Sequence, residues 1–321
     1  MNTTVLSTPA ALASADDLKQ AVIEFARAAS TEISTLDEKR LPILAEKLPP
    51  GTTVYVAHTP KASLQDVVRV ALLAKALGLK PSPHIVARRI ESEATLRAGL
   101  GALSEGGIEQ VLLVAGDLDR PLGRFSSTLE VIDTGALQDA GIRRIGVAGH
   151  PEGHRAVDDS ALLAALRYKQ AFGRQSGIAV HIVTQFGFDP QAICAWDRRL
   201  TEQEISLPVH VGIAGPTPLP KLIKFAMDCG VGASLGSLMK NMGNMAKLAG
   251  ISSTPGMATT PDEMFVGLLK GRAAYTGSRI VQPHLYAFGG TVSTADWLRA
   301  VADGAFDLPQ KGGRFELRDL A

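Results

Sequence analysis

The sequence predicts a closed (β/α)8 TIM barrel, an α/β fold, with an extra N-terminal helix and additional helices before the last strand. Short β-branched runs alternate with longer amphipathic runs along the chain. The eight short runs are mostly apolar on both faces, as parallel strands covered by helices are. Over the first seven, successive runs begin about 20–35 residues apart, which is the length of a βα unit.

The eight expected strands span residues 31–35, 53–58, 82–87, 110–116, 143–149, 179–185, 209–214 and 279–288. The expected helices span 63–79, 92–105, 125–140, 158–172, 190–203, 218–229, 234–249 and 259–275, and one more, at 11–29, precedes the first strand. An open sheet that binds a dinucleotide usually carries G-x-G-x-x-G after its first strand. That motif does not follow the first strand here, which favours the closed barrel.

Composition and charge exclude several functional classes. A net charge of +1 without a basic block argues against nucleic acid as the main partner. No apolar run reaches the roughly 18 residues of a membrane span, and we find no secretory signal. Cys194 and Cys229 make neither a metal-ligand spacing nor a disulfide framework, so we expect a reducing, cytoplasmic location. We expect one domain at 13–304, after a flexible arm at 1–12 and before a tail at 305–321.

The segment 181–189, reading HIVTQFGFD, is the most informative stretch for function. The expected strand ends at Gln185, Phe186 and Phe188 follow, and Asp189-Pro190 indicates a turn into a helix. Ligands of a parallel barrel are bound where the strands end. A neutral amide between aromatic rings suits a flat, hydrogen-bonding heterocycle. The alternative is a buried strand with a polar stop and a helix cap.

Other strand ends also carry polar side chains. Glu32 lies on the first strand, where a carboxyl group directed into the barrel would be desolvated, with its pKa raised toward that of a general acid. The alternative is an outward-facing glutamate. Asp117 follows Gly116 after the fourth strand and either serves the site or caps the next helix. The GHPEGH turn, with His150 and His154, indicates a polar turn lining a pocket rather than a metal site.

Residues 230–245 are rich in Gly and Met at helical spacing. This composition favours core packing, because Met fills irregular gaps. The glycines would also let the segment approach a ligand closely.

Taken together, the motifs resemble those of the methylenetetrahydrofolate reductase family. Over roughly residues 30–290 they read STEIS, VYVAHTPKASLQD, PHIVAR, VAGD, HPEGH, TQFGFD and GIAGPTPL, in the order and spacing of the family. The resemblance implies a barrel with a non-covalent flavin, FAD rather than FMN, that interconverts 5,10-methylenetetrahydrofolate and 5-methyltetrahydrofolate. It also implies a tetrahydrofolate substrate and a homo-oligomer, although nothing in the chain identifies an interface.

The resemblance assigns roles residue by residue. Glu32 matches the general acid, Asp117 the carboxylate near the flavin and the pterin, and Gln185 the amide that hydrogen-bonds the pterin. The flavin-contacting positions match Ala57, His58, Thr59, His84, Gly116, Asp117, His150, His154 and Lys169, with Lys169 suited to phosphate.

The chain also departs from the family pattern. Ala115 stands where the family usually has Arg, and Leu219 stands where it often has an aromatic ring that stacks on nicotinamide or folate. His150 replaces a frequent Tyr, and the last strand ends in Ala287-Phe288-Gly289-Gly290 instead of Leu-Asn-Arg. These departures leave the use of NAD(P)H and the direction of the reaction open. Two further interpretations stay open: a non-redox pterin-binding or methyltransferase-type barrel, and a flavin barrel with a non-folate substrate.

Overall fold

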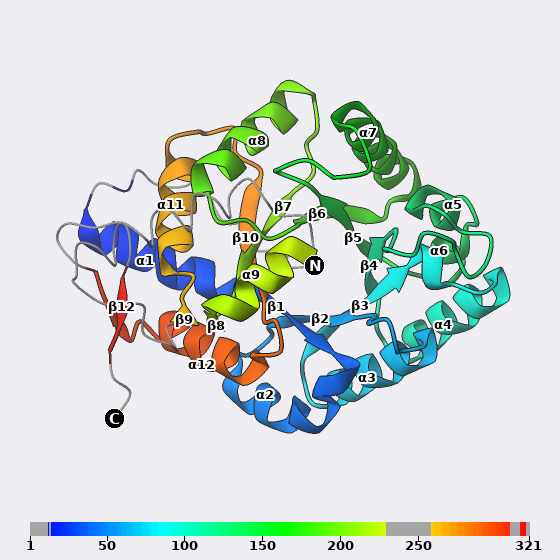
Figure 1. The fold of residues 1–321 in the computed structure, drawn as a ribbon, viewed down its shortest axis with the longest axis horizontal. Helices are drawn as coiled ribbons and strands as arrows, with labels where there is room; N and C mark the ends of the chain where they lie inside the picture. Colours follow the sequence, from blue (N-terminus) through cyan, green and yellow to red (C-terminus); the bar gives the residue numbers. More distant parts are fainter. Residues whose placement is uncertain (1–11, 13, 229–257, 309–314, 319–321) are drawn as a thin grey trace.

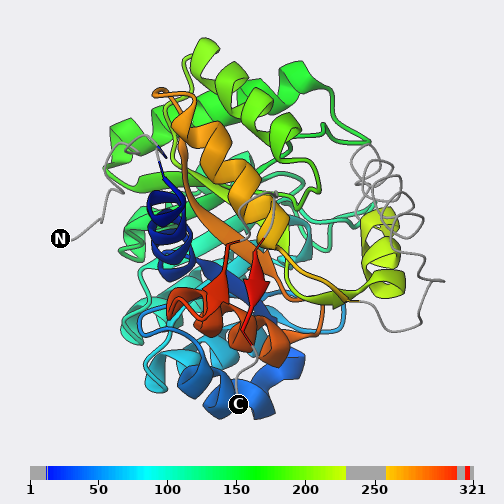
Figure 2. The same ribbon diagram turned by 90° about the vertical axis from the view of Figure 1, so that its left-hand side faces the viewer.

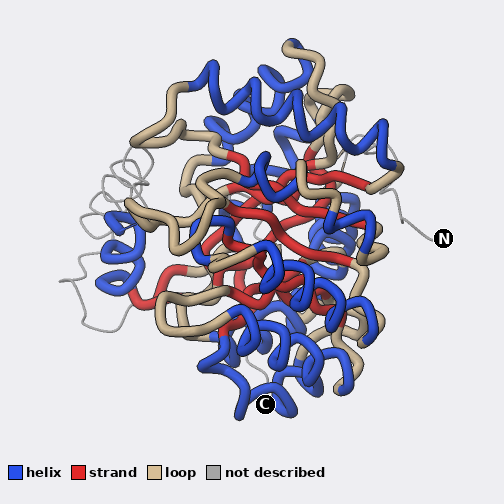
Figure 3. Tube along the Cα trace, turned by 90° about the vertical axis from the view of Figure 1, so that its right-hand side faces the viewer, coloured by secondary structure: helices blue, strands red, loops and turns tan. Residues whose placement is uncertain are grey.

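The computed structural model describes residues 12, 14–228, 258–308 and 315–318 (Figure 1). Eight parallel strands close into a barrel in the order β1-β2-β3-β4-β5-β6-β7-β10, with the helices outside (Figure 3). These strands are β1 (Ser30–Ser34), β2 (Thr53–Ala57), β3 (Lys80–Val86), β4 (Gln110–Val114), β5 (Arg144–Gly149), β6 (Ala179–Thr184), β7 (Val209–Ala214) and β10 (Ile280–Tyr286). The predicted barrel is therefore confirmed, and each strand end lies within about two residues of its expected position.

Helices surround this ring of strands. They are α1 (Ala15–Arg27), α2 (Leu41–Lys47), α3 (Leu64–Ala76), α4 (Glu93–Glu105), α5 (Thr128–Ile132), α6 (Ala136–Asp139), α7 (Asp159–Ser176), α8 (Pro190–Glu202), α9 (Leu219–Asp228), α11 (Asp262–Ala273) and α12 (Thr291–Ala302). Two 3-10 helices, η1 (Thr35–Arg40) and η2 (Ala87–Arg89), follow β1 and β3. None of the described helices has the length and hydropathy needed to cross a membrane.

The extra N-terminal helix and the additional helices before the last strand are both present. Helix α1 packs against α11 and α12, while α9 and α11 lie between β7 and β10. Helix α9 lies in front of the strand ring in Figure 1 and projects from the barrel in Figure 2. Helices α2 and α12 were not predicted from the sequence. The expected helix 234–249, the segment 230–245 and the arm 1–12, apart from Leu12, lie outside the described residues.

Capping side chains fix several helix starts. Ser14 and Ser63 each form a capping box with an aspartate three residues later, which satisfies two otherwise unpaired backbone N–H groups. Asp189 accepts hydrogen bonds from the backbone N–H groups of Gln191 and Ala192 and so caps α8. The predicted turn at Asp189-Pro190 is therefore confirmed.

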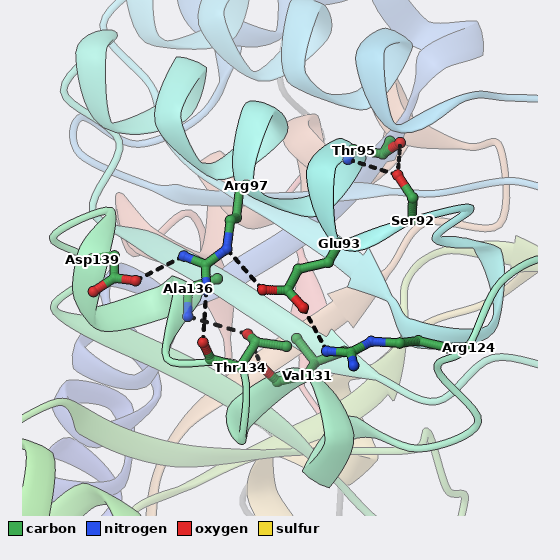
Figure 4. Close-up of polar contacts among 9 residues, drawn as sticks. All are labelled: Ser92, Glu93, Thr95, Arg97, Arg124, Val131, Thr134, Ala136 and Asp139. Atoms are coloured by element: carbon green, nitrogen blue, oxygen red, sulfur yellow. Dashed lines mark hydrogen bonds and ion pairs between the residues drawn. The ribbon is translucent and has the colours of Figure 1, made fainter.

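The expected continuous helix 125–140 is wrong, because the chain breaks into α5 and α6 (Figure 4). Gly135 has a φ of 71°, a left-handed conformation that interrupts a right-handed helix. The Thr134 hydroxyl donates to the carbonyl of Val131 and accepts from the N–H of Ala136. Arg97 of α4 then donates to the Thr134 carbonyl at 2.8 Å, so a neighbouring helix holds the break in place.

The large hydrophobic core lies between the strands and the helices, whereas the barrel interior is unusually polar. Tyr55 of β2 hydrogen-bonds His181 of β6 at 2.9 Å across the barrel, which requires both side chains to point inward. His181 stacks on His210 with 4.1 Å between ring centroids, and His284 bonds Ser30 at 3.0 Å. Barrel interiors are more often filled by Val, Ile and Leu.

The segment after α12 packs on the barrel. The short strands β11 (Phe306–Asp307) and β12 (Glu316–Leu317) pair with each other, and both Phe306 and Phe315 are buried. The Phe315 ring lies 4.5 Å from that of Phe306 and 5.9 Å from that of Trp297, between centroids.

We expect Phe315→Ala to lower the free energy of unfolding by about 3 kcal/mol, the usual cost of emptying an aromatic site in a core. Leu317→Ala, at a side chain that is 38% exposed, is the matched control and should change it by less than about 0.5 kcal/mol. Urea denaturation measures both. Equal, small effects would mean that residues 315–318 contribute nothing to the stability of the barrel.

Candidate active site

A cavity of about 560 Å³ opens at the carboxyl ends of the barrel strands. Its size lies in the range of small-molecule sites. Seven of the eight barrel strands, or the residues directly after them, contribute to its wall, together with η1, α9 and the start of α12. The polar or ionisable side chains of this wall are Glu32, Ser34, Asp37, Thr59, His84, His150, Gln185, Lys221, Tyr286 and Thr291. The predicted convergence of strand ends is thus present.

Glu32 points into the cavity, with 26% of its side-chain surface exposed there. Burial raises the pKa of its carboxyl group to about 8, and the nearby charge of Asp37 adds to the shift. Asp37 is itself held by the Ser34 hydroxyl and backbone N–H and by Thr291. Glu32 is therefore a carboxylic acid that keeps its proton at neutral pH, which is the state a general acid requires.

His84 is the neighbour of Glu32, with 3.7 Å between its Nε2 atom and the Glu32 Oε2 atom. Burial lowers the pKa of His84 to about 3, helped by the charge of His58. The contact is therefore between a neutral acid and a neutral imidazole, not an ion pair. His84 Nε2 is buried and has no hydrogen-bond partner among the described residues, so it can accept a hydrogen bond from the protonated Glu32 carboxyl group.

Gln185 follows β6 and lines the cavity beside aromatic rings. Its backbone N–H donates to the carbonyl of Gly149 at 2.8 Å, which fixes the strand end. Phe186 packs against Tyr286 and Phe288, with centroids 5.7 and 4.9 Å away. The ring of Phe225, from α9, stacks on Phe288 at 4.6 Å. An amide and an aromatic wall thus face the same space, as a site for a flat heterocycle requires.

The structure divides the site residues named from the sequence into two groups. Those that line the cavity are Glu32, Ala57, Thr59, His84, His150 and Gln185. Those that do not are His58, Gly116, Asp117, His154, Lys169 and Leu219. Leu219 is the first residue of α9, whereas His58 is buried with its Nε2 atom 2.9 Å from the carbonyl oxygen of Ala62.

Asp117 turns away from the cavity. Its carboxylate accepts a hydrogen bond from Arg89 at 2.8 Å, which lowers its pKa, and 68% of its side chain is exposed. Gly116 before it has a φ of 94°, and a Cβ atom there would lie 2.5 Å from the Val86 side chain. Glycine is therefore required at 116, because any other residue would be strained in this conformation and would clash with Val86.

His150, His154 and Lys169 form a group beside the cavity. The His150 and His154 rings lie 5.0 Å apart, and burial lowers the pKa of His150 to about 4, with the charges of His154 and Lys169 contributing. Lys169 is buried on α7, and this burial lowers its pKa to about 8. A cation held in a buried position is suited to bind an anionic ligand group, whose charge would raise the pKa of the ammonium group again.

Several cavity residues were not predicted from the sequence. Asp37 was recognisable through the S-x-x-D pattern it forms with Ser34, a capping signature directly after the first strand. Lys221 and Phe225 are four residues apart on a helix expected at 218–229, so they share a face. Among the described residues, no group of three or more His, Cys, Asp or Glu side chains is placed to hold a metal ion.

Comparison with known proteins identifies one family. The family model described as methylenetetrahydrofolate reductase matches residues 44–241, more than half of the chain. The matched segment includes Ala57, Thr59, His84 and Gln185 but neither Glu32 nor β10.

Solved structures that resemble this chain weakly include dihydropteroate synthase (FolP) from Thermus thermophilus. It has 14% identity, the match covers 84% of this chain and 91% of that one, and the TM-score is 0.41. They also include 3-dehydroquinate dehydratase from Aquifex aeolicus, with 10% identity, coverage of 57% and 78%, and a TM-score of 0.36. Similarities as weak as these do not indicate the function of this chain.

Proposed function

We propose, on the premise that this chain belongs to the methylenetetrahydrofolate reductase family, that it is a flavin-dependent oxidoreductase interconverting 5,10-methylenetetrahydrofolate and 5-methyltetrahydrofolate. Members of this family act on folate and generally bind a flavin. The observation that carries the proposal is Glu32, a carboxylic acid with a raised pKa that faces a cavity shared with an amide and aromatic rings.

Glu32 would hold the proton that the reaction needs. Reduction of the methylene bridge adds a hydride to the one-carbon unit and breaks its bond to one folate nitrogen, which takes up a proton. The Glu32 carboxyl group donates that proton, and in the oxidative direction its carboxylate accepts it. Gln185 would orient the pterin through its amide, which can both donate and accept hydrogen bonds.

The residues around the cavity fit a flavin ring. Small or apolar side chains of Ala57, Val114, Ala148 and Gly149 leave room for a flat ring system in the wall. The buried Nε2 atom of His84, which lines the cavity, has no hydrogen-bond partner among the described residues, and such an atom is suited to the polar edge of a ligand.

We expect Ala57, Thr59, His84 and His150 to hold the ring, and Lys169 with His154 to hold the phosphate. When bound, the flavin supplies hydride transfer. FAD is the expected flavin and FMN the alternative, while NADH, NADPH or neither serves as the electron donor.

The test is an anaerobic visible spectrum of the purified protein, recorded before and after addition of 5-methyltetrahydrofolate. We expect a flavin band that bleaches as the folate is oxidised. Chromatography of the released flavin then separates FAD from FMN. A flavin band that stays unchanged would retain the cofactor but point to a non-folate substrate. If the protein shows no flavin band even after reconstitution with FAD and FMN, the proposed redox function is overturned.

One observation favours a second candidate, a non-redox pterin-binding or methyltransferase-type barrel. Asp117, expected near the flavin and the pterin, is paired with Arg89 outside the cavity. Ala115 also lacks the charge that the family usually provides there. A colourless protein that binds tetrahydrofolates and cannot be loaded with flavin would support this candidate.

A further inference from the structure

The rim of the cavity carries a positive charge that the proposed chemistry does not use. Lys221, an exposed residue in the first turn of α9, is the sole Lys or Arg among the described residues that line the cavity. It forms no ion pair with any acidic residue in the described part of the chain. Glu32 lies at the deeper end, against His84 of the barrel interior. The cavity therefore has an acid and an amide inside and a cation outside.

The turn after β10 leaves space for this cation. Gly289 has a φ of 78°, and a Cβ atom built on it would lie 3.0 Å from Lys221 Nζ. Any other residue at 289 would be strained and would crowd the ammonium group. The turn is held by the hydrogen bond from Gly290 N–H to the carbonyl of Ala287, at 2.7 Å. Lys221 thus lies directly over a part of the rim that has no side chain.

Aromatic rings lie between the rim and the interior. Phe225, one helical turn after Lys221, stacks on Phe288 with ring planes 26° apart. Phe288 in turn stacks on Tyr286. All four residues line the cavity. The wall therefore combines hydrogen-bonding groups with a continuous run of aromatic rings from Tyr286 through Phe288 to Phe225, and an exposed cation lies one helical turn from the end of that run.

We propose that Lys221 is a specificity-determining residue that binds the carboxylate of the glutamate tail of a folate, while Phe225 and Phe288 pack against the aminobenzoyl ring that precedes the tail. This inference rests on the proposed function. A folate has the same three parts in the same order: a pterin, an aromatic ring and a carboxylate. A charge-assisted hydrogen bond from the ammonium group to the tail would separate folates from pterins that lack the tail.

The test compares two ligands on the holoenzyme with its flavin already reduced, under anaerobic conditions, so that 5-methyltetrahydrofolate binds without being oxidised. Binding of 5-methyltetrahydrofolate and of 6-methyltetrahydropterin, which has no aminobenzoylglutamate, is measured by calorimetry. We expect Lys221→Met to weaken 5-methyltetrahydrofolate binding on the order of tenfold, the scale of one hydrogen bond to a charged group. Binding of the tail-less pterin should not change. Lys221→Arg should restore most of the loss, and added salt, at about 0.5 M, should reduce the difference.

Lys39→Met is the matched control, because Lys39 is an exposed lysine of η1 at the same end of the barrel and does not line the cavity. It should leave both ligands unaffected. Unchanged folate binding in Lys221→Met would overturn the inference and leave the proposed function intact. Equal losses for both ligands would overturn it as well, because they would mean damage to the site rather than a lost tail contact. A wild-type protein that binds neither ligand would instead refute the folate function.

Discussion

Replacing Glu32 by glutamine is expected to reduce folate turnover by about 10²–10⁴-fold, the usual contribution of a positioned general acid or base. Glutamine keeps the shape of the side chain but cannot give up or take a proton at the folate nitrogen. The flavin content should not change, because Glu32 is not among the residues expected to hold it. Steady-state turnover of 5-methyltetrahydrofolate and the visible spectrum of the same sample measure the two quantities.

Glu38→Gln is the matched control. Glu38 is a carboxylate of η1 that pairs with Arg69 and does not line the cavity, so turnover should stay within about twofold, as for a surface substitution. Turnover by Glu32→Gln that stays close to wild type would remove Glu32 from the catalytic role. Loss of flavin together with activity would mean that Glu32 supports the structure of the site instead.

The pH dependence of wild-type turnover gives an independent measure of the same group. Because the pKa of Glu32 is raised to about 8, the proton donor is present below that pH. In the reductive direction the rate should fall as the pH rises through about 8. In the oxidative direction, which needs the carboxylate, the rate should rise up to about the same pH. A pH–rate profile governed by a group whose pKa is near 4.5 would contradict the assignment of Glu32 as the proton donor.

Acid is expected to destabilise this protein at an unusually mild pH. Burial lowers the pKa of His84, His181 and His284 to about 3 from a reference of 6.5, and that of His210 falls well below the same reference. These four histidines are neutral in the folded barrel but take up protons in the unfolded chain below pH 6.5. Their contribution to stability is therefore complete above pH 6.5 and is lost progressively as the pH falls toward 3.

Glu32 opposes this trend. Its raised pKa means that the folded state holds a proton that the unfolded state releases above pH 4.5, so its contribution is full below 4.5 and lost as the pH rises through about 8. Each group changes the free energy of unfolding by about 1.4 kcal/mol per pH unit. Taken by themselves, the four barrel histidines and Glu32 give a net loss on the order of 5 kcal/mol between pH 6.5 and 5, and the lowered pKa of His150 acts in the same direction.

Urea denaturation at pH 7, 6 and 5 measures this loss, and a pH-stat measures the protons taken up on unfolding, about three per chain near pH 5.5. His181→Gln retains an acceptor for the Tyr55 hydroxyl and should reduce the pH dependence by about one proton. His154→Gln, at an exposed position, should leave it unchanged. A free energy of unfolding that is flat from pH 7 to 5 would mean that the barrel histidines are protonated or solvated in the folded state.

The sequence by itself determined the order of the barrel strands, the closure of the barrel and the ends of its strands. These follow from periodicity and from signals a few residues long, such as the polar stop at Gln185 and the Asp189-Pro190 turn. It also placed Glu32 on the first strand but left both an inward and an outward side chain open, because alternation along a strand fixes which side chains share a face and not which face is inside. The structure shows that Glu32 lines the cavity. The helix expected at 125–140 was wrong because Gly135 takes a left-handed conformation, and a contact from Arg97, on another helix, holds the resulting break in place.

Only the tertiary structure decided the chemistry of the site. The pKa of Glu32 depends on its burial in the closed barrel. The contact of Glu32 with His84 and the ion pair of Asp117 with Arg89 each join residues about 30 to 50 positions apart in the sequence. The contact of Lys221 with the Gly289 turn joins residues that are further apart still. Distances of this kind are set by strand register and barrel closure, and no local pattern encodes them. Local periodicity therefore specifies where the strands end, and the closed barrel specifies which side chains face the cavity and what each of them meets there.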